Sequence, residues 1–268
     1  MIYFCPTPIG NLGDISLRTL EVLKNVDIIY AEDTRVTIKL LNHYDINKKL
    51  MTYHKFNETK ASDKIIENLR NGLDIALVTD AGMPGISDPG FILIKKLIEK
   101  EIEFRVLPGA NAALTALISS GLDNQHFYYY GFTNSKSSLR KKEFESIKNI
   151  KATLIFYEAP HRLIGFLTDM FEVFGDREIA ISRELTKIHE ETIRGKISKI
   201  LNENLTLKGE FVIVVEGNTD KKESPDIKNL LITKMNEGFS KSQAVKKVAE
   251  EYNLSKNIVY KESLDLDV

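Results

Sequence analysis

The chain has 268 residues, of which 43% are hydrophobic and 28% are charged, and its formal net charge is -1. These values are typical of a globular protein with an ordinary apolar core, and they exclude a grossly basic nucleic-acid binder, so any contact with a polyanion must come from a local patch. Cys5 is the single cysteine, which excludes a disulfide framework and a cysteine-built metal site. The first residues contain neither a basic segment nor a long apolar stretch, so we expect no signal peptide, no membrane span and a cytoplasmic location.

Short apolar runs bounded by Gly, Asp and Pro alternate with helical patterns over most of the chain. We expect strands at Ile2–Phe4, Asp27–Ala31, Ile75–Thr79, Phe104–Leu107, Phe127–Tyr130, Thr153–Tyr157, Glu178–Ser182 and Phe211–Glu216. We expect helices at Ser16–Lys24, Asp63–Asn71, Phe91–Lys100, Asn111–Ser119, Leu163–Phe174 and Lys196–Asn204. Alternation of this kind predicts α/β layers.

Two interruptions of this pattern predict domain boundaries. The first is the segment Ser120–Asn124, and the second is the polar segment Gly217–Ser224, which has no apolar period. We therefore expect an N-terminal α/β domain over residues 1–120, a second α/β domain over 121–218 and a small helical module over 225–268.

The helical module is expected to contain three short helices, Ile227–Asn236, Ser240–Tyr252 and Ser255–Leu264. Ser240 and Ser255 are natural N-caps, and Ala244, Val245, Val248 and Ala249 form one apolar stripe that Leu254, Ile258 and Val259 could meet. The arrangement resembles a helix-turn-helix module. A helical cap without nucleic-acid contact is equally compatible, because the segment is nearly charge-balanced.

The segment Asp80–Gly90 is the most informative of three shaped loops that follow predicted strands. It holds three glycines, two prolines and two aspartates in eleven residues, more than an ordinary strand-to-helix connection needs. The segments Pro6–Ser16 and Pro108–Asn111 follow two other strands in the same way. Because ligands of open α/β sheets bind at the carboxyl ends of the strands, the three loops predict a small-molecule crevice. The chain has no G-x-G-x-x-G or P-loop sequence, so it lacks the usual dinucleotide and phosphate cradles.

Charged residues cluster in the second half. The segments Tyr157–Arg162 and Ser182–Glu191 each follow an apolar strand, and they could carry chemistry or form structural ion pairs. Basic residues from Lys136 to Lys151, Arg140 among them, could meet a phosphate backbone or form a solvated face. His161 and His189 are not at metal-ligand spacing, so we expect no metal site.

Five segments, in this order, resemble the ribosomal RNA small subunit methyltransferase I family of the tetrapyrrole methylase superfamily: Thr7–Ser16, Asp80–Gly90, Tyr157–Leu163, Arg183–Glu191 and Gly209–Gly217. The resemblance covers nearly the whole chain and includes the helical tail. It implies two α/β domains with S-adenosyl-L-methionine in the cleft between them, and methylation of the ribose 2′-hydroxyl of a cytidine in the decoding region of 16S ribosomal RNA. It also implies a homodimer that acts on 16S ribosomal RNA within the small ribosomal subunit. The chain departs from the family pattern at Met83, Ala110-Asn111, Thr133-Asn134 and Ala159.

The resemblance, the basic segment and the chemistry of methyl transfer together indicate three sets of side chains. Cofactor contacts are implied for Pro8, Asp80, Gly82, Ile86, Ser87, Ala112, Ala113, Phe132, Tyr157, Gly209, Glu210 and Phe211. RNA contacts are expected for Asn11, Lys136, Arg140, His161, Arg162 and Arg183. Glu158, Glu184 and Lys187 are the expected catalytic residues, and a lysine that accepts a proton would need a depressed pKa.

Such a reaction needs no metal or nucleophilic side chain, because the cofactor carries the reactive group. Two other hypotheses remain open at this point. One keeps the cofactor but makes a tetrapyrrole or another small molecule the acceptor. The other is a helix-turn-helix regulator whose α/β part senses a ligand.

Overall fold

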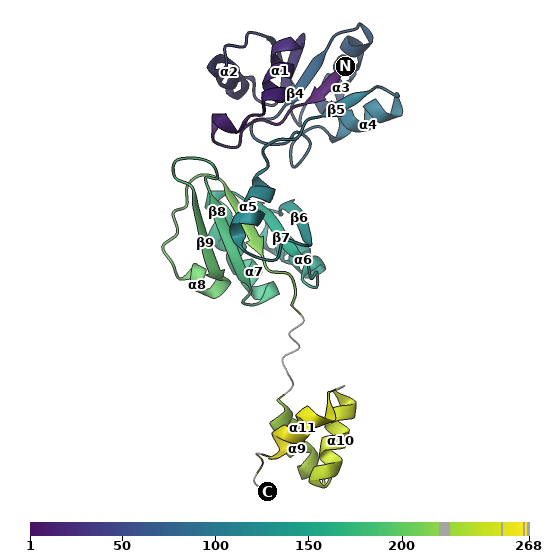
Figure 1. The fold of residues 1–268 in the computed structure, drawn as a ribbon, viewed down its shortest axis with the longest axis vertical. Helices are drawn as coiled ribbons and strands as arrows, with labels where there is room; N and C mark the ends of the chain where they lie inside the picture. Colours follow the sequence, from purple (N-terminus) through teal and green to yellow (C-terminus); the bar gives the residue numbers. More distant parts are fainter. Residues whose placement is uncertain (220–225, 253, 265, 267–268) are drawn as a thin grey trace. The chain divides into compact units, whose positions relative to one another are not determined.

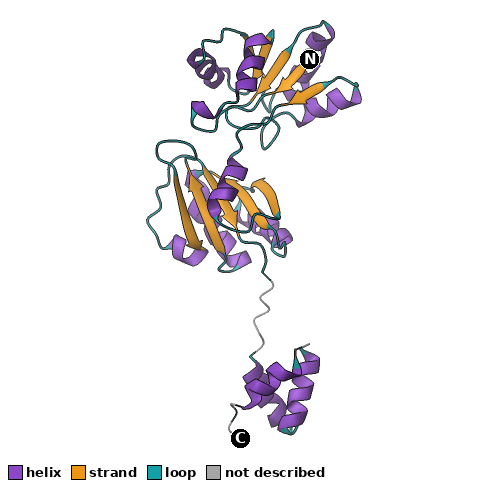
Figure 2. Ribbon diagram, in the orientation of Figure 1, coloured by secondary structure: helices purple, strands orange, loops and turns teal. Residues whose placement is uncertain are grey.

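The computed structural model describes residues 1–219, 226–252, 254–264 and 266, and it divides them into two units, Met1–Asn218 and Thr219–Val268. Two five-stranded sheets follow one another in the first unit (Figure 1), and the second unit contains only helices in its described part (Figure 2). The predicted linker Gly217–Ser224 lies largely outside the described residues.

The first sheet is parallel throughout. Its spatial order is β3 (Lys49–Thr52), β2 (Ile28–Ala31), β4 (Ile75–Val78), β1 (Ile2–Phe4) and β5 (Phe104–Val106). Side chains of α1 (Leu17–Asn25) and α2 (Thr34–His43) pack on one face, and those of α3 (Glu58–Arg70) and α4 (Phe91–Glu99) pack on the other. With both faces covered, strands β2 and β4 are buried at every position, which explains their continuous apolar runs.

The second sheet is mixed. Its spatial order is β6 (Phe127–Phe132), β7 (Thr153–Glu158), β10 (Phe211–Val215), β8 (Glu178–Arg183) and β9 (Glu191–Lys196), and only β6 and β7 are parallel. Three helices pack on one face: α6 (Ser137–Ile147), α7 (Leu163–Phe174) and α8 (Ile197–Leu201). The single helix α5 (Ala112–Ser120) packs on the other face through Ala113, Ala116 and Leu117.

The helical unit consists of α9 (Ile227–Asn236), α10 (Lys241–Glu251) and α11 (Lys256–Leu264). Ser240 and Gln243 form a capping box at the start of α10. The predicted stripe is confirmed, since Ala244, Val245, Val248 and Ala249 are buried with Leu231 and Val259. Ile258 is 54% exposed, so the expectation that it joins this core is wrong.

Four elements were not predicted from the sequence: helices α2 and α6 and strands β3 and β9. The predicted start of α3 was five residues too late. The prediction also extended α8 beyond Leu201. The missed strands are sheet edges with mostly exposed or half-exposed side chains, so they carry no apolar run. In the part of the chain that the structure describes, no helix has the length and apolarity required to cross a membrane.

Candidate functional site

Three loops that follow parallel strands of the first sheet meet at one edge. The loops after β1 and β4 are joined by two backbone hydrogen bonds of 2.9 Å, since Thr7 N–H donates to the Gly82 carbonyl and Gly82 N–H donates to the Thr7 carbonyl. The loop after β5 packs against the loop after β1, because a Cβ on Gly109 would lie 2.6 Å from the Cβ of Pro6. The predicted convergence of the three loops is therefore confirmed.

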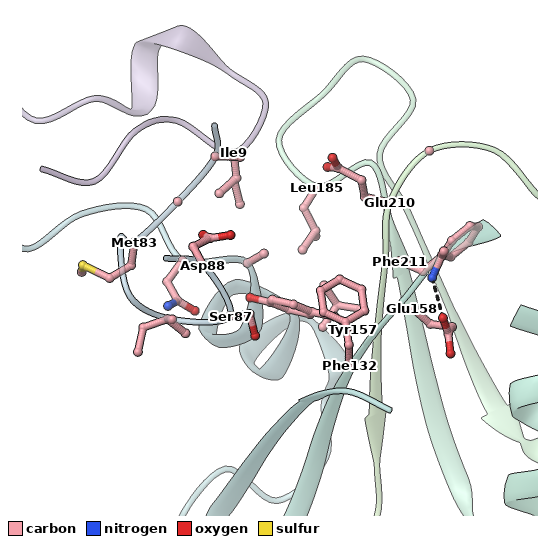
Figure 3. A pocket seen from close by; sticks show the side chains of 18 of the residues that line it. Ile9, Met83, Ser87, Asp88, Phe132, Tyr157, Glu158, Leu185, Glu210 and Phe211 are labelled. Carbon is pink, nitrogen blue, oxygen red and sulfur yellow. Dashed lines mark hydrogen bonds between the residues drawn. The ribbon is translucent and has the colours of Figure 1, made fainter. Parts of the chain in front are cut away.

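A cavity of about 320 Å³ lies between these loops and the second sheet. Ile9, Met83 and Asp88 line it from the loops, while Phe132 and Tyr157 line it from β6 and β7 (Figure 3). Its volume is in the range of small-molecule sites, and its lining is largely apolar with few polar groups, as such sites require.

Most of the residues assigned to a cofactor by resemblance border this cavity. Those that line it are Gly82, Ile86, Ser87, Ala112, Phe132, Tyr157, Gly209, Glu210 and Phe211. The remaining three, Pro8, Asp80 and Ala113, are chain neighbours of lining residues. Asp88 and Leu185 also line the cavity; neither was predicted as a contact, although both lie in segments with informative sequences.

The loop after β4 is attached to the second sheet through Ser87. The Oγ of Ser87 and the phenolic oxygen of Tyr129 on β6 are 2.5 Å apart and share a hydrogen bond. Ser87 has a φ of 62°, a left-handed conformation that costs a non-glycine residue about 1 kcal/mol or more. A Cβ on Gly131 would lie 3.0 Å from Ser87 Oγ, so the glycine makes room for this contact.

A second link joins the loop after β1 to the segment after β8. The N–H of Asn11 donates to Thr186 Oγ1 at 2.9 Å, and a Cβ on Gly10 would lie 2.5 Å from Cγ of Lys187. Glycine is therefore required at position 10 for the two segments to approach each other. The Asn11 side chain is exposed, and its Oδ1 accepts from Gly13 N–H at 2.9 Å.

Asp88 has the most perturbed carboxyl group in the cavity wall. Burial raises its pKa to about 6, and the negative charges of Glu32 and Asp80 act in the same direction. A hydrogen bond with Thr79 opposes the shift without cancelling it. Thr79 Oγ1 itself donates to Glu32 Oε2 at 3.0 Å, so the two carboxyl groups share one hydroxyl neighbour.

Lys187 sits between two carboxylates beside the cavity. Its Nζ lies 2.9 Å from Glu184 Oε1 and 3.3 Å from Glu210 Oε2. Burial lowers the pKa of Lys187, but the hydrogen bond with Glu184 and the charges of Glu210 and Glu184 outweigh burial, so the pKa is raised overall. The hydrogen bond from Lys187 in turn lowers the pKa of Glu184. Lys187 is therefore an ammonium at neutral pH and donates hydrogen bonds. A lysine that accepts a proton would need a depressed pKa instead.

Glu158 points away from the aromatic side chains of the cavity. Successive residues of a strand face opposite sides of the sheet, so Glu158 is directed to the face opposite that of Tyr157, as Figure 3 shows. There its Oε1 accepts from Ala159 N–H at 2.8 Å and pairs with Arg162 Nε at 3.1 Å. Burial raises the pKa of Glu158, while the Ala159 hydrogen bond and the Arg162 charge oppose the shift.

The other residues predicted to contact RNA differ in accessibility. Lys136 and His161 are exposed, whereas Arg162 is half-buried and donates to the Thr133 carbonyl at 2.9 Å. Arg183 pairs with Glu191 at 3.0 Å. Arg140 is only 5% exposed and forms an ion pair with buried Asp169 of α7, so the prediction of an RNA contact at Arg140 is wrong.

The cavity fits a donor such as S-adenosyl-L-methionine, which carries a flat aromatic base and two cationic groups. Phe132 and Tyr157 offer aromatic surface to the base, with ring centroids 5.5 Å apart. Gly82 has a φ of +80°, a backbone conformation that glycine adopts readily, and this lets the wall turn at that point. Among the described residues, no group of three or more His, Cys, Asp or Glu side chains is arranged to hold a metal ion.

Comparisons with known proteins agree with this geometry. Residues 1–201 match the family Tetrapyrrole (Corrin/Porphyrin) Methylases. The chain is 46% identical over 271 residues to the ribosomal RNA small subunit methyltransferase I of Bacillus subtilis, covering 97% of this chain and 92% of that protein. It is 41% identical over 275 residues to the protein of the same name from Synechocystis, covering 100% of this chain and 98% of the relative.

Solved structures share the fold at low sequence identity. A diphthine synthase matches with a TM-score of 0.64 and 14% identity over 80% of this chain and 89% of that one. A uroporphyrin-III-C-methyltransferase from Thermus thermophilus matches with a TM-score of 0.58 and 20% identity, over 80% of this chain and 93% of that one. The predicted fold class, two α/β domains of the tetrapyrrole methylase type with a helical tail, is confirmed.

The burial of Arg140 gives a stability prediction. Arg140→Ala leaves the Asp169 carboxylate buried without its main partner, so we expect a loss of about 3 kcal/mol in the free energy of unfolding, measured by urea denaturation. Lys142→Ala, an exposed position on the same helix, should change it by less than about 0.5 kcal/mol. Equal effects of the two substitutions would show that the ion pair contributes nothing.

Proposed function

Because the chain belongs to the tetrapyrrole methylases and, within them, to the ribosomal RNA small subunit methyltransferase I family, we propose that it methylates the ribose 2′-hydroxyl of a cytidine in 16S ribosomal RNA. The observation that carries this proposal is similarity over nearly the full length, together with a donor-sized cavity at the meeting point of three loops. S-adenosyl-L-methionine, when bound, supplies the methyl group.

The side chains around the cavity have distinct tasks in this proposal. Phe132 and Tyr157 hold the aromatic base, and the backbone at Gly82 and Gly209 allows close approach. Lys187, held as an ammonium by Glu184 and Glu210, donates a hydrogen bond to the ribose oxygen as negative charge develops there. Glu184 is then a positioning residue.

The RNA backbone is bound by cations near the carboxyl ends of β7 and β8. Arg162 and Arg183 carry planar guanidinium groups suited to phosphate, and Lys136, His161 and Asn11 have exposed side chains that can also contact RNA. Glu158 orients Arg162 through their 3.1 Å ion pair. The acceptor is RNA in the small ribosomal subunit, which implies a cytoplasmic protein.

Methyl transfer to purified small ribosomal subunits tests this function. The protein with labelled S-adenosyl-L-methionine should label 16S RNA, and mass mapping should find a single 2′-O-methylcytidine. Lys187→Met should lower kcat by roughly 10²-fold while the donor Kd, measured by calorimetry, stays nearly unchanged. Lys60→Met, an exposed lysine on α3, is the matched control and should retain activity.

Other outcomes would contradict the proposal. Methylation of a porphyrinogen but not of RNA would establish a small-molecule acceptor. Donor binding without any methyl transfer to RNA, free or assembled, would favour a ligand-sensing regulator. Loss of donor binding in Lys187→Met would place Lys187 on the donor side.

We also propose that residues 226–268 contact RNA. Positive charge around the apolar core of this compact unit comes from Lys241, Lys246 and Lys247 of α10 and from Lys256 and Lys261 of α11. Deleting 226–268 should raise the KM for ribosomal subunits by about tenfold, with a smaller salt dependence, and leave the donor Kd unchanged. Equal loss of donor and RNA binding would show that the tail supports the α/β unit instead.

We further propose that the protein is a homodimer. Leu114 and Ile118 are 48% and 70% exposed and lie one turn apart on α5, a pair of apolar side chains that a second copy could cover. Sedimentation equilibrium should give twice the chain mass of 30.4 kDa, and the double variant Leu114→Glu, Ile118→Glu should give the single-chain mass. A monomeric wild-type protein would rule the dimer out.

A further inference from the structure

The ionisable side chains of the cavity wall narrow the choice of a proton acceptor. Four residues that border the cavity can titrate: Asp88, Tyr157, Glu158 and Glu210. A ribose hydroxyl must lose its proton when its oxygen is methylated, so the group that takes the proton has to be ionised and reach the cavity.

Three of the four do not meet this requirement. Burial raises the pKa of Tyr157 well above its ordinary value, so the phenol keeps its proton at neutral pH. Glu158 faces the other side of the sheet and pairs with Arg162. The Glu210 side chain is 77% exposed and its carboxylate pairs with Lys187, which weakens it as a base.

We infer that Asp88 is the group that accepts the 2′-hydroxyl proton, an inference that rests on the proposed methyltransferase function. The proton passes from the ribose oxygen to an Asp88 carboxylate oxygen, the freed electron pair forms the oxygen–methyl bond, and the methyl–sulfur bonding pair stays on sulfur. In Figure 3 the Asp88 carboxylate projects from the loop after β4 toward the centre of the site, on the wall opposite Phe132.

The surroundings of Asp88 make it a stronger base than an ordinary carboxylate. Burial raises its pKa to about 6, with further contributions from Glu32 and Asp80, so it is mostly ionised at neutral pH yet holds a proton better than an exposed aspartate. The hydroxyl of Thr79 and the phenols of Tyr129 and Tyr157 are the other polar groups that interact with it.

The competing role for Asp88 is an ionic contact with the ammonium group of the donor. The two roles differ in what removal of the carboxylate changes. A proton acceptor affects kcat and its pH dependence, whereas an ammonium contact affects the donor Kd.

The test compares wild type with Asp88→Asn on small ribosomal subunits under single-turnover conditions. We expect the wild-type rate to fall about tenfold per pH unit below about pH 6, as Asp88 becomes protonated. Asp88→Asn should be slower by roughly 10²-fold at pH 8 and should lose this acid limb. Its donor Kd, measured by calorimetry, should change by less than about threefold. A Kd raised tenfold or more with an unchanged rate at saturating donor would assign Asp88 to the ammonium and overturn the inference.

Glu32→Gln is the matched control. It removes a negative charge that acts on Asp88 without removing a cavity-lining group, so the acid limb should move to lower pH while the rate at pH 8 is retained. An unmoved acid limb in Glu32→Gln would show that the limb does not report Asp88.

A measurement without donor or RNA checks the titration itself. Because the pKa of Asp88 is raised on folding from its ordinary value of 3.8 to about 6, folding favours the protonated carboxyl. That contribution is complete below pH 3.8 and is lost as the pH rises through about 6. The stability of wild type relative to Asp88→Asn should therefore fall across this window, and a pH-independent difference would count against the assignment.

The outcomes separate this inference from the proposed function. If the wild-type protein methylates no RNA, the proposed function is wrong, whatever the role of Asp88. If wild type methylates RNA and folded Asp88→Asn does so at the same rate, the function stands and the inference fails.

Discussion

The pair of backbone hydrogen bonds between Thr7 and Gly82 is the constraint on which the site depends. Strands β1 and β4 are parallel neighbours, so their loops leave the sheet at the same edge, and the two bonds fix the separation of those loops. Gly82 reaches this pairing with a φ of +80°, which other residues rarely adopt. Ile9 on one loop and Asp88 on the other can then form a single wall.

Two further links set the second wall against the first. Ser87 is held by Tyr129, and Asn11 is held by Thr186, so the loops after β4 and β1 each make a polar contact with the second half of the α/β unit. Ser87, Glu184 and Thr186 all have positive φ values, although none is glycine. Such backbone strain persists where the surrounding contacts enforce it, and it clusters at functional sites. Here it coincides with the two places where the halves of the α/β unit meet.

The buried strands and the three loops could be predicted from the sequence because continuous apolar runs and Gly-Pro segments are local signals. The edge strand Glu191–Lys196 could not, since its polar residues look like a charged loop. The segment from Lys136 to Lys151 was interpreted by charge, but Phe144 and Ile147 make it a core helix, and Asp169 lies 29 residues from the Arg140 that it neutralises. That pairing depends on how α6 and α7 pack, which no local pattern specifies.

The orientation of Glu158 follows from the two-residue period of a strand and could have been predicted from the sequence. Tyr157 and Glu158 are consecutive in a strand, so a period of two already places them on opposite faces. The two opposite faces of the end of β7 therefore carry different chemistry. One face presents an aromatic surface to the cavity, and the other carries the Glu158–Arg162 ion pair. On the proposed function, a small donor binds on the first side and a polyanion meets cations at the strand ends. Because the chain has a net charge of -1, binding of a polyanion depends on individual cations such as Arg162 and Arg183 and not on the overall charge.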